Sequence, residues 1–120
     1  MVTFPSSKIE TRLGSPVWIA EEERGRPLGI IRFAIGSGKA TASVTIAPDA
    51  RGNGLAAPVV AAGTRKLLAK NSALLVQAFI RPGNTPSERA FSLAGYVPAG
   101  RDVENGVELL RYVVPEEPSS

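Results

Sequence analysis

The residues of this chain that could do chemistry lie around a glycine-rich loop, because the two commonest catalytic side chains are missing. None of the 120 residues is a cysteine or a histidine. Thiolate nucleophiles, cysteine metal sites and a Ser-His-Asp relay are therefore excluded, and the commonest general base is absent. Any reaction must depend on carboxylates, hydroxyls, backbone amides or the reactivity of the substrates themselves.

The stretch PDARGNGLAAPV (48–59) predicts the start of a helix directly after a glycine-rich turn. Proline has no N–H and clashes with the preceding turn inside a helix, so Pro58 is tolerated only in the first turn. The helix is therefore expected to begin near Asn53 or Gly54. Its first backbone N–H groups would lack helical partners.

These N–H groups predict an anion site over Gly52 to Ala56. A helix N-terminus carries about half a positive charge and binds phosphate readily. The glycines allow a ligand to approach the backbone, and Arg51 adds a full charge. The segment is therefore predicted to hold a phosphate group, with a glycine turn that binds nothing as the alternative.

Two other phosphate-binding loops fit less well. A P-loop requires Gly-Lys-Ser/Thr at the start of the helix, where this chain has leucine and alanine. The dinucleotide fingerprint G-x-G-x-x-G/A is matched by Gly52, Gly54 and Ala57, but the segment 48–51 precedes the glycines, which in that fingerprint follow the strand immediately. Arg81 follows the next predicted strand, where that fingerprint needs an acidic residue.

The elements that must position this loop are predicted from hydrophobic patterning. Residues 1–120 are predicted to form a single domain, which begins with a polar lead-in (1–15) and ends with a tail (115–120). Between them we expect strands over 16–23, 28–35 and 40–48, a helix over 54–70, a strand over 73–80, a helix within 86–94, and strands near 96–99 and 107–114. This order predicts a mixed α/β sheet, of the α+β type.

A second motif, NTPSERAFSLAGY (84–96), predicts the shorter helix and its two ends. The sequence TPSE (85–88) has the pattern of a capping box with Thr85 as the N-cap, and Gly95 is expected to end the helix in the left-handed conformation. The amide of Asn84 would then be available to another partner. The alternative is that Asn84 is only a turn residue before the helix.

Together the two motifs resemble the GNAT family of N-acetyltransferases over residues 17–114. The sequence of Arg51–Ala56 matches the family's Arg/Gln-x-x-Gly-x-Gly/Ala coenzyme signature, between a strand and a helix in the family's order. Asn84, followed eleven residues later by Gly95 and Tyr96, is similar to the second half of the family's coenzyme site.

The resemblance implies a fold, a cosubstrate and a reaction. The fold would be a mixed, mostly antiparallel sheet with helices on both faces and a shortened N-terminus, splayed between strands 40–48 and 73–80. The reaction would move an acetyl group from acetyl-CoA directly to a primary amine of a small molecule. The implied coenzyme contacts are Thr45, Ile46 and Ala47 for the pantetheine arm, Arg51, Gly52, Asn53, Gly54, Leu55 and Ala56 for the pyrophosphate, and Asn84 and Phe91 near the thioester.

The chain departs from the family at the groups that usually move protons. Phe91 stands where the family often has a tyrosine that protonates the departing thiolate. The glutamate base common on the strand before the loop is also absent. The carboxylates of Glu21, Glu22 and Glu23 are expected to form a solvated strand end, so no catalytic residue is assigned.

The N-terminus also departs from the family, whose members usually open with a strand and two helices that wall the acceptor pocket. Here only about sixteen residues precede the first predicted strand. The chain is then either a piece of a longer protein, or its acceptor site is open or completed by a partner subunit, as in a homodimer.

The acceptor is expected to be a small-molecule amine. The stretches 25–33 and 80–87 and Phe91 are most similar to the branch of the family that acetylates amino-sugar nucleotides. A catalytically weak acyl-CoA-binding module, which regulates or assembles with a partner, is the alternative function.

Charge and hydropathy argue against other partners. The net charge is +3, and the cations are spread along the chain without a block of five, so no nucleic-acid partner is expected. The sequence has neither an apolar run of about 20 residues nor a signal-peptide pattern. We therefore expect no membrane partner and a cytoplasmic location.

Overall fold

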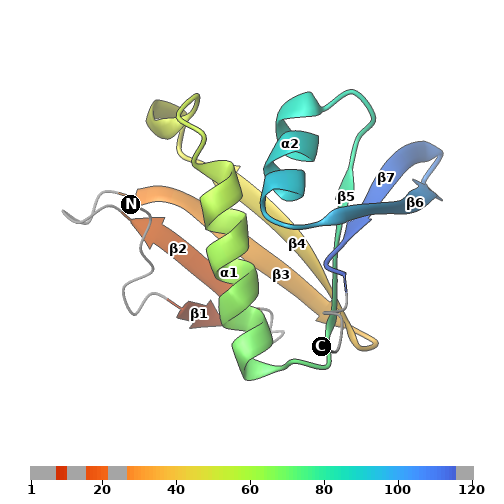
Figure 1. The fold of residues 1–120 in the computed structure, drawn as a ribbon, viewed down its shortest axis with the longest axis horizontal. Coiled ribbons are helices and arrows are strands. Elements are labelled where there is room, and N and C mark those ends of the chain that lie inside the picture. The colour runs from red at the N-terminus through yellow and green to blue at the C-terminus, as the bar shows by residue number, and fades with distance from the viewer. Residues whose placement is uncertain (1–7, 11–15, 22–26, 116–120) are drawn as a thin grey trace.

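The computed structural model describes residues 8–10, 16–21 and 27–115, which form a seven-stranded sheet and two α-helices (Figure 1). The strand order is β1-β2-β3-β4-β5-β7-β6, and among the described strands only β4 and β5 pair in parallel. The elements are β1 (Lys8–Glu10), β2 (Pro16–Glu21), β3 (Pro27–Gly36), β4 (Lys39–Ile46), a 3₁₀ turn (Pro48–Ala50), α1 (Ala56–Lys70), β5 (Leu75–Ile80), α2 (Thr85–Leu93), β6 (Val97–Glu104) and β7 (Val107–Val113).

The predicted fold class and order of elements from the second strand onward are confirmed. Two strands differ from the prediction. β1 lies inside the segment expected to be a polar lead-in, and it pairs with β2. β6 continues to Glu104 instead of ending near residue 99, because its hairpin turn lies at Asn105 and Gly106, both with positive φ.

Both described helices lie on one face of the sheet, whereas helices on both faces were expected. α1 connects β4 to the neighbouring β5, and α2 connects β5 to β6, two places further in the same direction. Because crossovers between parallel strands are right-handed, two crossovers in one direction place their helices on the same face. α1 packs on β2, β3 and β4 and against α2, and Figure 1 shows both helices in front of the sheet.

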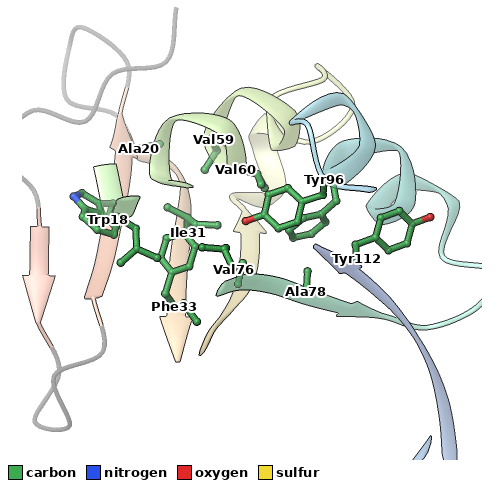
Figure 2. Packing of buried hydrophobic residues seen from close by; sticks show 14 of the residues in the cluster. Trp18, Ala20, Ile31, Phe33, Val59, Val60, Val76, Ala78, Tyr96 and Tyr112 are labelled. Atoms are coloured by element: carbon green, nitrogen blue, oxygen red, sulfur yellow. The ribbon is translucent and has the colours of Figure 1, made fainter. Parts of the chain in front are cut away.

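The hydrophobic core fills the space between this sheet face and the two helices (Figure 2). Its largest fully buried side chains come from β3, α1 and β5, and they are Phe33, Ile31, Val59, Val60 and Val76. Burying each of them stabilises the fold by about 1.5–3 kcal/mol. These contacts fix the position of α1 on the sheet.

Gly63 allows α1 to approach β3 closely, as its small-residue face predicts. A Cβ atom at this position would lie 2.5 Å from Cγ2 of Ile31. The helix axis, and with it the position of the helix N-terminus, therefore depends on the missing side chain.

A buried hydrogen bond joins α1 to the chain just after α2. The hydroxyl of Tyr96 lies 2.8 Å from Oγ1 of Thr64. Burial raises the pKa of Tyr96 to about 12, although the bond to Thr64 opposes the rise. The hydroxyl is therefore neutral at physiological pH, and its hydrogen bond connects α1 to the segment that follows α2. Within the described residues, neither helix is long and apolar enough to cross a membrane.

Candidate functional site

The sheet splits between β4 and β5, as the sequence led us to expect. The two strands pair only at Lys39 with Leu75, Ala40 with Val76, and Thr41 with Gln77. Beyond these pairs, β4 continues to residue 46 and β5 to residue 80 without pairing to each other. The strands diverge toward their carboxyl ends (Figure 1), and we call this opening the fork.

Alternation along β4 decides which backbone groups face the fork. The N–H of Ala47 donates to the carbonyl oxygen of Leu28 at 2.8 Å, so Ala47 bonds toward β3. Bonding in an antiparallel pair alternates from residue to residue, so Thr45 also bonds toward β3. Val44 and Ile46 therefore direct their N–H and C=O groups toward the fork.

Of Thr45, Ile46 and Ala47, which were expected to contact the pantetheine arm, only Ile46 has this orientation. Val44 has it too, and the sequence interpretation missed it. The alternation of residues along the strand could not identify Val44 by itself. The register with β3, in which Val44 lies opposite Ile31, is also needed. That register depends on contacts that are distant in the sequence.

The loop after β4 is held in shape by two of its own side chains. Arg51 Nε donates to the carbonyl oxygen of Ile46 at 3.1 Å. Asn53 Nδ2 donates to the carbonyl oxygens of Ala50 at 3.1 Å and of Arg51 at 3.4 Å. Among the described residues the Nη groups of Arg51 have no acceptor, so they remain available to an anion.

Gly52 and Gly54 are required by the backbone conformation of this loop. Their φ angles are +82° and +69°, in the left-handed region that side chains disfavour. A Cβ atom at either position would meet no atom of the described residues within 4 Å. The space over this backbone is therefore open, and the glycines leave it accessible to a ligand.

Helix α1 begins at Ala56, two to three residues later than expected, with Leu55 as its N-cap. The reason is the positive φ of Gly54, which cannot be part of a right-handed helix. Pro58 is the third residue of the helix, within the first turn as predicted. The N–H of Val59 makes the first helical bond, to the carbonyl of Leu55 at 3.1 Å.

The first turn of α1 leaves backbone donors without partners. Leu55 provides no side-chain cap, and the N–H groups of Ala56 and Ala57 precede the first helical bond. In the part of the chain that the structure describes, no acceptor is found for them. They lie next to the open glycine backbone, so the predicted anion site has the donors that it needs.

Helix α2 is capped by Asn84 and not by Thr85, which corrects the predicted capping box. Asn84 Oδ1 accepts from the N–H of Ser87 at 3.4 Å, and Thr85 is already the first residue of the helix. Glu88 does not reach back to the cap, because its Oε1 accepts a hydrogen bond from the Tyr112 hydroxyl at 3.1 Å. The Nδ2 donor of Asn84 has no acceptor among the described residues.

The predicted end of α2 at Gly95 is confirmed. Gly95 has a φ of +101°, its N–H donates to Ser92 at 3.1 Å, and the N–H of Tyr96 donates to Phe91 at 3.0 Å. This pair of bonds is the Schellman motif. It turns the chain so that the Tyr96 side chain enters the core.

No tyrosine replaces the hydroxyl that Phe91 lacks. Phe91 is buried and packs edge-on against Tyr96, with the ring centroids 5.0 Å apart, so it belongs to the core. The hydroxyl of Tyr96 is occupied by Thr64. Tyr112 lies on β7, beyond β5 from the fork, and burial, followed by its hydrogen bond to Glu88, raises its pKa.

Glu21, the first of the three acidic residues expected at a solvated strand end, does not border the fork. Glu21 is the last residue of β2, and β3 separates β2 from β4. Glu22 and Glu23 lie outside the described residues. The structure therefore gives no reason to assign these carboxylates a catalytic role.

Positive charge gathers at the open end of the fork. α1 follows β4 and α2 follows β5, so both helices begin at the carboxyl ends of the diverging strands. Each helix N-terminus favours an anion. Arg51 after β4 and Arg81 after β5 are both exposed and add full charges. The arrangement can bind a phosphate group at the mouth of the fork, with an extended chain alongside β4.

Comparisons with known proteins agree with this geometry. The family model described as FR47-like protein matches residues 35–102, which is more than half of the chain. No curated protein matches the sequence significantly.

Three solved structures share the fold at low identity. One is a chimera of spermidine N-acetyltransferase SpeG from Vibrio cholerae and hSSAT (TM-score 0.74, 17% identity, 83% of this chain and 66% of that chain). Another is a mutant of SpeG from Vibrio cholerae (TM-score 0.73, 16% identity, 83% and 63%). The third is aminoglycoside acetyltransferase AAC(6')-Ib in complex with coenzyme A (TM-score 0.74, 18% identity, 88% and 69%). The chain thus spans just under two thirds of the length of these SpeG structures.

The matched segment runs from the end of β3 to β6 and contains the fork, the glycine loop and both helices. The chain therefore belongs to the FR47-like family, and its fold is that of the GNAT acetyltransferases.

Proposed function

We propose that this protein is an acetyl-CoA-dependent N-acetyltransferase that moves the acetyl group directly to a primary amine of a small molecule. The observation that carries the proposal is the fork, whose mouth has unpartnered backbone donors at the start of α1 and the charge of Arg51. Family membership and the shared fold support it. The proposed location is the cytoplasm.

In this proposal the coenzyme lies along β4 with its pyrophosphate on the glycine loop. The backbone N–H groups of Val44 and Ile46 face the fork and would bond the pantetheine arm, with Thr45 and Ala47 beside it. Asn84 would donate from Nδ2, and Phe91 would support that wall from within the core. The pyrophosphate contacts would be Arg51, Gly52, Asn53, Gly54, Leu55 and Ala56.

The chemistry needs few protein groups. The neutral amine attacks the thioester carbonyl, the C–N bond forms, the C–S bond breaks, and coenzyme A leaves as a thiolate while the nitrogen loses a proton to water. A thiolate is a fair leaving group, because the pKa of a thiol is roughly 8.5. A backbone N–H in the fork can stabilise the oxyanion that forms during attack. The reaction therefore needs no cysteine, no histidine and no tyrosine at position 91.

For the acceptor, we propose a small primary amine. Two of the similar structures are named for spermidine and one for aminoglycosides, and these compounds share primary amines. An amino sugar is the more specific candidate and rests on the sequence stretches 25–33 and 80–87. A homodimer that completes the acceptor site belongs to the same proposal.

Release of coenzyme A thiol from acetyl-CoA tests the function. The panel should contain spermidine, an aminoglycoside and glucosamine, with matched alcohols as controls. We expect thiol release above the hydrolytic background with at least one amine and with no alcohol. Tight coenzyme binding without release for any amine would favour the other candidate, a catalytically weak acyl-CoA-binding module, for which the buried Phe91 is the favouring observation.

Arg51→Glu is expected to weaken binding of coenzyme A by at least tenfold and binding of pantetheine by less than threefold. The proposed partner of Arg51 is a phosphate, and charge-assisted bonds to phosphate are among the strong ones. Isothermal titration of both ligands to the variant and the wild type measures the difference. Equal losses for the two ligands would mean that Arg51 acts only by holding the loop through Ile46.

A further inference from the structure

Gln77 carries a buried polar atom that has no hydrogen-bond partner in the part of the chain that the structure describes. The side chain is 7% exposed. Its Nε2 donates to Oγ1 of Thr41 at 3.2 Å, but its Oε1 is fully buried and has no hydrogen-bond partner within the described residues. A buried carbonyl oxygen without a partner is unfavourable, because it has lost its hydrogen bonds to water. The large majority of buried side-chain polar atoms in proteins are paired, so a donor from outside the described residues is expected here.

Gln77 stands at the closed end of the fork. Gln77 and Thr41 form the last pair of β4 and β5 before the strands diverge. Val76 and Ala78, on either side of Gln77, are part of the core beneath the helices. Because successive side chains of a strand point to opposite faces, Gln77 points away from the two helices.

The position of Gln77 on the sheet face away from the helices determines which substrate could contact it. The helix face of the fork is filled by core side chains, and no described helix covers the opposite face. In the proposed function the coenzyme enters at the mouth of the fork, so its phosphates and amides lie nearer to the glycine loop. The thioester would then point toward the closed end, where the acceptor would meet it from the face opposite the two helices.

We propose that the Gln77 side chain, whose Oε1 is enclosed in this structure, rotates when the acceptor binds, so that Oε1 accepts a hydrogen bond from the N–H of the acceptor amine and Gln77 becomes a binding residue for the acceptor. The inference rests on the proposed function. The bond would orient the amine so that its lone pair faces the thioester carbonyl. An amide oxygen is too weak a base to remove the proton, which still leaves to water. The class of ligand is therefore an amine that retains N–H groups.

Two substitutions separate this role from a structural one. Gln77→Met has similar volume but no acceptor, whereas Gln77→Glu keeps oxygen acceptors at the same place. Thr41 can donate its hydroxyl to the carboxylate, since a hydroxyl both donates and accepts. The measurements are kcat and KM for the most active amine among spermidine, an aminoglycoside and glucosamine, together with the Kd of coenzyme A and the Tm.

For Gln77→Met we expect kcat/KM for the amine to fall at least tenfold, with the Kd of coenzyme A within twofold of wild type and no loss in Tm. Gln77→Glu should keep kcat/KM within about threefold. An unchanged kcat/KM in Gln77→Met would mean that Oε1 holds only a water, and an equal loss of coenzyme A affinity would identify the coenzyme as the donor. Either result overturns this inference alone. A wild type that acetylates no amine overturns the proposed function as well.

Discussion

Gly54→Val is expected to raise the Kd of coenzyme A at least a hundredfold while the protein remains folded. The φ of Gly54 is +69°, and its Cα faces open space next to the unpartnered N–H groups of α1. A branched side chain would occupy the space where the pyrophosphate must reach the backbone, and would also strain the loop. Isothermal titration with coenzyme A and thermal unfolding measure the two effects.

The matched control is Gly38→Val in the turn between β3 and β4. Gly38 has a φ of +76° and, like Gly54, would place an added Cβ more than 4 Å from any atom of the other described residues beyond its chain neighbours. It lies at the closed end of the fork, where its carbonyl accepts from Leu75. The two variants should lose similar stability, but only Gly54→Val should lose coenzyme A. Wild-type affinity in a folded Gly54→Val would show that the glycine loop is not the phosphate site.

The second large effect is expected in the dependence of kcat/KM on pH. Below the pKa of the acceptor amine, kcat/KM should rise about tenfold per pH unit, because only the neutral amine attacks. No cysteine or histidine exists to impose another ionisation in this range. The hydroxyls of Tyr96 and Tyr112 are engaged elsewhere, and burial raises the pKa of each.

A series of amines with different pKa values, measured from about pH 6 to about pH 9, makes this prediction specific. The midpoint of the rise should follow the pKa of each amine. The protein should remain folded over this pH range. The neutral hydroxyl of Tyr96 contributes fully to stability below its unfolded pKa of 10.0, and this contribution is lost as the pH rises toward its folded pKa of about 12. A bell-shaped profile whose limbs stay fixed across the series would reveal a catalytic group of the protein. The carboxylates of Asp49 and Glu88, on the elements around the fork, would then be the first to replace.

Features that depend on local backbone chemistry could be predicted from the sequence. The glycines at 52 and 54 and Pro58 are informative because positive φ and the missing proline N–H restrict the chain within a few residues. Gly95 ended α2 as expected for the same reason. The proposed anion site at the mouth of the fork depends on these restrictions.

Features that depend on register or on distant contacts could not be predicted. Val44 faces the fork only because of its pairing with β3. Gln77 became a candidate only when the structure showed where the parallel pairing ends. The cap of α2 moved from Thr85 to Asn84 because Tyr112, which is distant in the sequence, takes the carboxylate that the capping box needed. Such choices are made by tertiary contacts.

The central claim is direct transfer of acetyl from coenzyme A to an amine nitrogen, and mass spectrometry with an isotope-labelled acetyl group tests it most directly. Labelled acetyl-CoA would be incubated with the protein and the amine that gives the most thiol release. We predict one labelled acetyl group per molecule of acceptor, attached to nitrogen and equal in amount to the coenzyme A released, with the mass of the protein unchanged. Label on the protein before it reaches the acceptor, or coenzyme A release without labelled amine, would contradict the account.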